Sequence, residues 1–240
     1  EETDPVLWDG LVSGRYPRLI EDFPLVDDPG TAFHYSNLTS NWLGIIVARA
    51  CGTSLKSFAQ THLFDLIGAR AGDWGTDANG YNNGCADLHL TARDAGRFGL
   101  LYLNLGRFEE RQVVAEDWVS ESLATYSDDI NSAGIRAGRA GRYLHNIRYG
   151  YHWWSAEAGD SRFSLAWGHG GQLIVLLHDL DMVIVVTSKP FYLQHDQESW
   201  MHEKANLNLV GKFIQSLERD PLSPARQSPP SDTRTTTNER

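Results

Sequence analysis

A tyrosine and an asparagine two residues apart are the first groups in this chain that could take part in catalysis. They belong to the run Tyr35-Ser36-Asn37, which follows the turn-forming pair Pro29-Gly30 and a short alternating segment. Proline presets φ and glycine accepts positive φ, so a turn is expected there. Ser36 and Asn37 both suit a helix N-cap, and helical periodicity begins directly after them. The phenol and the carboxamide would then lie at a helix entrance, where both could face one cleft. The structural alternative is an aromatic anchor with Asn37 as the cap.

A glycine-rich run in the second half of the chain is the other candidate site. Gly168-His169-Gly170-Gly171-Gln172 lies between two predicted strands, at residues 163–167 and 173–177. Glycines in such a turn let the backbone approach a ligand closely, and they leave N–H groups that can bind a developing oxyanion. The structural alternative is a glycine-rich β-turn that happens to contain a histidine.

The run Tyr35-Ser36-Asn37, with Pro-Gly-Thr-x-Phe before it, resembles the serine hydrolases of the beta-lactamase and penicillin-binding-protein superfamily. Within that superfamily the likeness is to the class C-like branch of esterases, D-amino peptidases and nylon-oligomer amidohydrolases. Further likenesses follow in family order: a helix pair joined by Gly-Thr-Ser, a helix beginning at Thr91, the glycine-rich turn in place of Lys-Thr-Gly or His-x-Gly, and a terminal helix. The resemblance covers roughly residues 27–217.

The resemblance implies a role for each of six residues. Tyr35 corresponds to the acid/base tyrosine, and Asn37 to the amide that binds substrate. His169 would be an electrostatic or hydrogen-bonding partner of the substrate and of Tyr35. The remaining three, Gly170, Gly171 and Gln172, would form the oxyanion-binding turn, with a backbone N–H near Gly171 or Gln172 as one donor.

The nucleophile of that superfamily is absent from these 240 residues. It is a Ser-x-x-Lys pair on a helix, with the amine one turn away from the hydroxyl that it activates. No serine in the chain has a lysine three positions later, and the nearest match, Thr53-Ser54-Leu55-Lys56, begins with threonine and follows the tyrosine run instead of preceding it. We therefore expect the nucleophile helix and the first strands of the sheet to lie in a segment before Glu1.

The composition is that of a globular protein, with 41% apolar and 11% aromatic residues. A net charge of −10 and a pI near 5.3 provide no basic surface for nucleic acid. No segment is apolar over the length needed to span a membrane, and nine histidines without ligand spacing predict no metal site. Cys51 and Cys85 make no disulfide framework, and Cys51 is expected to be a buried small hydrophobe.

Periodicity predicts helices over residues 38–50, 53–68, 91–105, 116–124 and 199–217, and strands over 149–154, 163–167, 173–177 and 182–187. The second helix is expected to bury Leu55, Phe58, Leu63 and Leu66. The last helix is expected to pack on the sheet through Ala205, Leu209, Phe213, Ile214 and Leu217.

Two long segments are predicted to be loops. Residues 72–89 are rich in Gly, Asn and Asp, and their Trp74, Tyr81 and Asn82 could contact substrate or simply be buried. Residues 126–148 are predicted to form an exposed excursion, whose arginines (Arg136, Arg139, Arg142 and Arg148) could meet an anionic substrate or be solvated.

The expected fold is α+β and beta-lactamase/transpeptidase-like: a helical region plus an antiparallel sheet flanked by helices. Residues 1–217 would be the C-terminal portion of one domain, with a mainly helical and loop region over 1–148 and strands and a terminal helix over 149–217. Residues 218–240, with four prolines and almost no aliphatic side chains, are expected to be disordered.

The function that the resemblance implies is hydrolysis of a small-molecule ester or amide, including a lactam or a D-amino peptide, through an acyl-enzyme. It implies no cofactor and no nucleic-acid partner. It is compatible with a periplasmic or secreted location and with a cytoplasmic one. The alternative is a non-catalytic binding or sensor module, and a contiguous upstream segment with Ser-x-x-Lys would decide for the enzyme.

Overall fold

A computed structural model describes residue 13 and residues 27–128, 140–189 and 196–218. Its helices are α3 (Asn37–Cys51), α4 (Leu55–Ala59), a π-helical turn (Gln60–Phe64), a 3₁₀ turn (Asp65–Ile67), α5 (Ala92–Leu103), α6 (Glu116–Leu123), a 3₁₀ turn (His178–Leu180) and α7 (Asp196–Glu218). Its strands are β1 (Arg107–Phe108), β2 (Arg111–Gln112), β3 (His145–Tyr149), β4 (Trp154–Ala158), β5 (Ser161–Gly168), β6 (Gln172–Leu177) and β7 (Met182–Val186).

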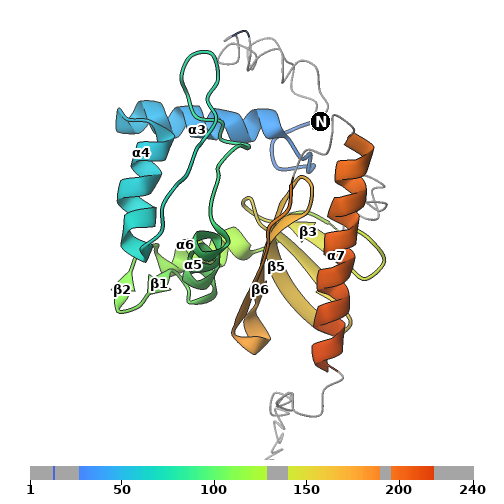
Figure 1. Cartoon of the computed structure of the whole chain (residues 1–240). Coiled ribbons are helices and arrows are strands. Elements are labelled where there is room, and N and C mark those ends of the chain that lie inside the picture. The colour runs from blue at the N-terminus through green and yellow to red at the C-terminus, as the bar shows by residue number, and fades with distance from the viewer. Residues whose placement is uncertain (1–12, 14–26, 129–139, 190–195, 219–240) are drawn as a thin grey trace, which may run out of the picture.

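The main sheet has five strands in the order β3-β4-β5-β6-β7, and every neighbouring pair is antiparallel. Strands that follow one another in the sequence therefore lie side by side. In Figure 1 α7 runs along one side of this sheet and α5 lies on the other, while α3 runs across the top of the view and α4 descends from its end. The expected α+β fold, an antiparallel sheet flanked by helices, is confirmed. Among the described residues no helix has both the length and the apolar character needed to cross a membrane.

The largest core lies between the sheet and α7. Alternate residues of β4, namely Trp154, Ala156 and Ala158, point into it because side chains of a strand alternate between the two faces. They meet Leu207 and Ile214 of α7, both fully buried. The terminal helix was thus predicted correctly to pack on the sheet, and Ile214 and Leu217 contact this core as expected. The prediction was wrong for Ala205, Leu209 and Phe213, which are exposed.

The helix pair after the tyrosine run differs from its prediction in two ways. A helical hairpin, with the second helix running back along the first, was the expectation for this short joint. The joint begins at Gly52, in the left-handed conformation, and α4 leads away from the end of α3 (Figure 1). A π-helical turn then changes the rotation per residue, so Phe64 and Ile67 are the fully buried residues, whereas Leu63 and Leu66 are half-buried.

Three further predictions are corrected by the structure. Residues 149–154 are not one strand: β3 ends at Tyr149, a turn follows, and β4 begins at Trp154. The predicted excursion over residues 126–148 contains most of β3, and Ile147 is 1% exposed because it packs in the main core. Cys51 is exposed, since the last turn of α3 reaches solvent. Arg136, Arg139 and almost all of the predicted tail lie outside the described residues.

Glycine allows α5 to pack closely on the far face of the sheet. A Cβ at Gly99 would lie 2.6 Å from Val183 Cγ1 of β7 and 2.9 Å from Ile174 Cγ2 of β6. Both neighbours are β-branched and have little rotamer freedom to move away. One turn earlier, a Cβ at Gly96 would meet only Val185 Cγ2, at an ordinary 3.8 Å.

Alanine at these two glycines should therefore change stability in opposite directions. Gly99→Ala should destabilise the fold by about 1–3 kcal/mol through overpacking. Gly96→Ala should stabilise it by up to about 1 kcal/mol, because alanine is the better helix former. The measurement is the urea midpoint of each purified variant. Equal midpoints for the two variants would show that α5 does not approach the sheet this closely.

Candidate active site

The segment that carries Tyr35 is fixed at both ends. Ser36, with extended backbone angles, is the N-cap of α3, and its Oγ accepts a hydrogen bond from the Thr39 backbone N–H at 3.2 Å. On the other side Thr31 donates to the Asp28 carbonyl, from its N–H at 3.1 Å and its hydroxyl at 2.7 Å. The predicted turn, extended segment and helix start are confirmed. Ser36 is the cap, and Asn37 is the first residue of the helix.

Aromatic contacts hold the Tyr35 ring against the sheet. The ring stacks on Trp154 of β4, with centroids 5.6 Å apart and planes at 23°. It also meets the Tyr149 ring edge-on, with centroids 5.8 Å apart. The centroid of the Phe33 ring lies 5.1 Å from that of Tyr149. The direction of the phenol is therefore set by residues more than a hundred positions away.

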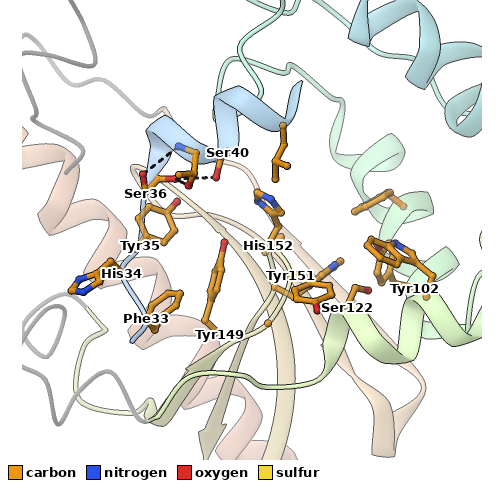
Figure 2. Close-up of a pocket in the computed structure, with 17 residues that line it drawn as sticks. Phe33, His34, Tyr35, Ser36, Ser40, Tyr102, Ser122, Tyr149, Tyr151 and His152 are labelled. Carbon is orange, nitrogen blue, oxygen red and sulfur yellow. Dashed lines mark hydrogen bonds between the residues drawn. The ribbon is translucent and has the colours of Figure 1, made fainter. Parts of the chain in front are cut away.

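Tyr35 lines a pocket of about 500 Å³ between α3, α5, α6 and the turn that joins β3 to β4. Figure 2 shows Tyr35, Tyr149 and His152 directed toward the first turn of α3. Aromatic and hydroxyl side chains make up most of the lining, and none of the lining residues is Asp, Glu, Lys or Arg. The lining consists of Phe33, His34, Tyr35, Ser36, Thr39, Ser40, Leu43, Phe98, Tyr102, Trp118, Ser122, Tyr149, Gly150, Tyr151, His152, Trp153 and Ala166.

The turn over residues 150–153 forms one wall and is hydrogen-bonded in place. The Gly150 N–H donates to the Trp153 carbonyl at 2.8 Å, and the Tyr151 N–H donates to the Ser122 carbonyl at 3.1 Å. A Cβ at Gly150 would lie 2.2 Å from the Ala124 carbonyl oxygen, so only glycine fits between this turn and the end of α6. His152 has φ of 63°, in the left-handed region.

The glycine-rich turn is built around a buried carboxylate. Glu203 of α7 is 2% exposed, and its Oε2 accepts a hydrogen bond from the Gly170 N–H at 3.1 Å. The same oxygen lies 3.7 Å from His169 Nδ1. A Cβ at Gly171 would lie 2.9 Å from the Glu203 Cα, and φ there is 84°. This glycine thus permits a close approach to α7, whereas the sequence suggested an approach to ligand.

The predicted site residues are divided between these two places. Tyr35 lines the pocket, whereas Asn37 and residues 169–172 are not among its lining residues. A chain of rings connects the two places, since Trp154 stacks on Tyr35 and also lies 5.5 Å from Trp167, two residues before His169. Within the described part of the chain, no three His, Cys, Asp or Glu side chains gather where they could hold a metal ion.

Sequence reasoning missed the pocket wall and Glu203. Tyr149, Tyr151 and His152 belong to an aromatic run that was interpreted as a continuous strand, and its Gly150 was the sign of a turn. Glu203 carries no local sign of its burial.

Loop residues proposed as substrate contacts have structural partners instead. Trp74 Nε1 donates to the Asn83 carbonyl at 2.9 Å, and the Tyr81 hydroxyl accepts from Arg49 Nε at 3.2 Å. Asn82 is 6% exposed, and its Oδ1 accepts a hydrogen bond from the Lys56 backbone N–H at 3.1 Å. The structure therefore supports the alternative in which these residues hold the loop together.

The antiparallel sheet between helices is the α+β fold of beta-lactamase-like and transpeptidase-like proteins. The family model described as Beta-lactamase matches residues 3–207, and the chain belongs to this family. A comparison with curated proteins finds no match.

Solved structures share the fold at low sequence identity. A Bacillus anthracis protein provisionally named a 6-aminohexanoate-dimer hydrolase has a TM-score of 0.65 at 22% identity, over 86% of this chain and 50% of its own. The octameric penicillin-binding protein homologue from Pyrococcus abyssi has a TM-score of 0.56 at 14% identity, over 83% of this chain and 47% of its own. EstCE1, a hydrolase with promiscuous acyltransferase activity, has a TM-score of 0.55 at 14% identity, over 82% of this chain and 62% of its own. The chain thus spans about half to three fifths of the length of these proteins.

Two histidines should make the stability of the fold depend on pH. Desolvation by the surrounding protein lowers the pKa of His152 and of His178 below the usual 6.5, although both side chains keep one side open to solvent. Below pH 6.5 the unfolded chain therefore binds more protons than the folded one, so stability is full above this pH and falls as the pH drops further.

We expect the melting temperature to fall between pH 7.5 and 5.5, and to fall less in a His152→Asn, His178→Asn double variant. Asparagine stays uncharged and tolerates the left-handed backbone at position 152. The measurement is thermal unfolding by circular dichroism in matched buffers. Parallel curves for the two proteins would contradict the assignment.

Proposed function

We propose that this chain forms part of a serine hydrolase that cleaves an ester or amide through an acyl-enzyme. In this proposal a serine outside these residues attacks the substrate carbonyl, and Tyr35, together with a lysine next to that serine, transfers protons. Asn37 binds the substrate amide, and the turn over residues 169–172 stabilises the tetrahedral oxyanion.

The observation that carries the proposal is the position of the Tyr35 phenol. It lies on the wall of a pocket, at the start of α3, with its ring held by Trp154 and Tyr149. Rigid placement is what a proton-transfer group needs, because its efficiency depends on geometry as well as on pKa. Membership of the beta-lactamase family supports the same role. So do relatives of the same fold that are named as hydrolases.

The oxyanion role of the glycine-rich turn is limited by hydrogen bonds already made within it. The Gly170 N–H donates to Glu203, and the Gly171 N–H donates to the Gly168 carbonyl at 3.2 Å. In this arrangement neither N–H points to a substrate, so the proposed role falls to Gln172 and to His169, whose orientation the Glu203 carboxylate can influence from 3.7 Å.

The nucleophile in this proposal must come from sequence beyond these 240 residues, because no Ser-x-x-Lys occurs within them. The competing function is a non-catalytic binding module that keeps the pocket without the chemistry. The two functions can be distinguished by whether a longer form of the protein contains the Ser-x-x-Lys serine and lysine.

The 240-residue chain alone should show no turnover, because Tyr35 has no nucleophile to serve. The assay uses p-nitrophenyl acetate and a chromogenic cephalosporin, with heat-inactivated protein as the baseline. Joining or adding an upstream segment with the Ser-x-x-Lys helix should produce turnover and label the serine with a fluorophosphonate. Enzyme-level turnover by the 240-residue chain itself would refute the proposed source of the nucleophile.

In the active form, Tyr35→Phe should lower kcat by about 10²–10⁴-fold, the usual weight of a positioned acid/base, and leave the melting temperature nearly unchanged. Tyr102→Phe is the matched control, since it removes a phenol from the α5 side of the same pocket. Equal activities of these two variants would remove Tyr35 from the mechanism.

A further inference from the structure

The face of α7 that points away from the sheet carries an exposed apolar row. Met201, Ala205 and Leu209 follow one another at intervals of four residues, so they lie on one face of this 23-residue helix. Met201 is 64% exposed and Leu209 is 63% exposed, the highest values among the large apolar side chains of the described residues. Ala205 between them is exposed as well. In Figure 1 α7 lies on the outer side of the sheet, so this row is open to a partner.

The packing of α7 within its own chain does not use this row. Leu207, Val210 and Ile214 lie on the opposite face of the helix and are buried in the core against the sheet. Apolar surface left in water forgoes roughly 25 cal/mol for each Å² that could be buried. The exposed row is therefore explained by a contact outside the described fold, and not by the core.

Two unlike charges bracket the row at equal distances from its centre. Glu198 lies seven residues before Ala205 and Lys212 seven residues after it, and seven residues make close to two helical turns, so both lie on the same face as Ala205. Lys212 is exposed and Glu198 is half-exposed. Neither forms an ion pair with another residue of the described part of the chain. Along one helix they are about 21 Å apart, too far to meet each other.

This spacing is symmetric about Ala205, and we propose that α7 packs antiparallel against α7 of a second copy of the chain, with the two-fold axis at Ala205. Met201 of each copy then faces Leu209 of the other, and Glu198 of each copy faces Lys212 of the other. Alanine at the axis lets the two helices approach closely. A two-fold contact of this kind uses the same surface on both subunits.

The charges select the antiparallel direction. A parallel pair would place Glu198 opposite Glu198 and Lys212 opposite Lys212, and like charges across an interface are unfavourable. The antiparallel pair forms two ion pairs, one at each end of the apolar row. The interface consists of one helix from each copy and does not involve the pocket beside Tyr35, so it is independent of the proposed hydrolase function.

Sedimentation velocity of the full 240-residue chain tests the association. A contact of one helix pair lies at the small end of specific interfaces, so we expect a dimer with a Kd of about 10–100 µM. Runs from about 5 to 500 µM, at pH 7.5 and physiological ionic strength, bracket this value. Leu209→Glu should abolish the dimer, because a carboxylate would be buried without a partner in each copy. A monomer throughout the range would mean that another segment or partner covers the row and would overturn the proposal.

Ile46→Glu is the matched control, since it places the same charge on α3 at a residue that is 51% exposed. It should leave the Kd unchanged. Both substituted side chains are exposed in the wild type, so the fold should persist, which thermal unfolding by circular dichroism checks. A dimer that survives Leu209→Glu would show that the copies associate through another surface, and would reject this one.

Charge reversal tests the register of the two helices. Glu198→Lys and Lys212→Glu should each weaken the dimer by about fivefold to twentyfold, because each change turns two ion pairs into two like-charge contacts. The double variant should return the Kd to within about threefold of the wild type, since both pairs form again with reversed sign. The two residues cannot meet within one helix, so such a rescue can only arise between copies. Additive weakening in the double variant would contradict the antiparallel register.

A disulfide at the axis checks the direction in a separate way. In a Cys51→Ser background, which removes the exposed native thiol, Ala205→Cys should form a covalent dimer on mild oxidation. Met201→Cys should not, because its counterpart in the second copy lies about 12 Å away along the helix. Equal cross-linking of both variants would indicate a parallel pair and would overturn the proposed arrangement.

Discussion

The stacking of Tyr35 on Trp154 is the contact on which the proposed site depends. Tyr35 lies before the first described helix, whereas Trp154 begins β4, and the two rings are 5.6 Å apart. Trp154 is 3% exposed and belongs to the core between the sheet and α7. The position of the phenol is therefore tied to the packing of the largest core. A shift of the sheet would move the tyrosine with it, which is a more secure arrangement than a loop residue held only by its own turn.

Close helix–sheet packing on both faces gives the sheet the rigidity that this contact requires. Gly99 brings α5 against Val183 and Ile174 on one face, and Gly171 brings the β5–β6 turn against α7 on the other. Neither position has room for a Cβ without movement of its neighbours. The same glycine that looked like a means of approach to a substrate is thus explained by approach to a helix, and the buried Glu203 carboxylate fixes the turn from that helix.

The parts of the fold that depend on local chemistry could be predicted from the sequence. Ser36 and Gly52 determine the ends of α3, Thr91 caps α5, and the β-branched runs form the β6–β7 hairpin. The errors arose where tertiary contacts decide. On α7 the burial of Ile214 was predicted, but only packing on the sheet selects Leu207 instead of Leu209 and Phe213. The turn after β3 depends on positive φ at His152, a conformation that an aromatic-rich run gives no sign of. Of the candidate site, the place of Tyr35 at a helix start was predictable, whereas its pocket combines five separate segments of the chain.

The charge distribution around Tyr35 bears on how the work of catalysis would be shared. The pocket lining contains no Lys, Arg, Asp or Glu, and the buried carboxylate of Glu203 is hydrogen-bonded to the glycine-rich turn. In the proposed mechanism the cation that assists proton transfer by Tyr35 is therefore a lysine from outside the pocket lining. The family's Ser-x-x-Lys helix would bring that charge together with the nucleophile. In the proposed enzyme, these residues would hold the tyrosine and shape the pocket, and the Ser-x-x-Lys helix would supply the positive charge and the nucleophile.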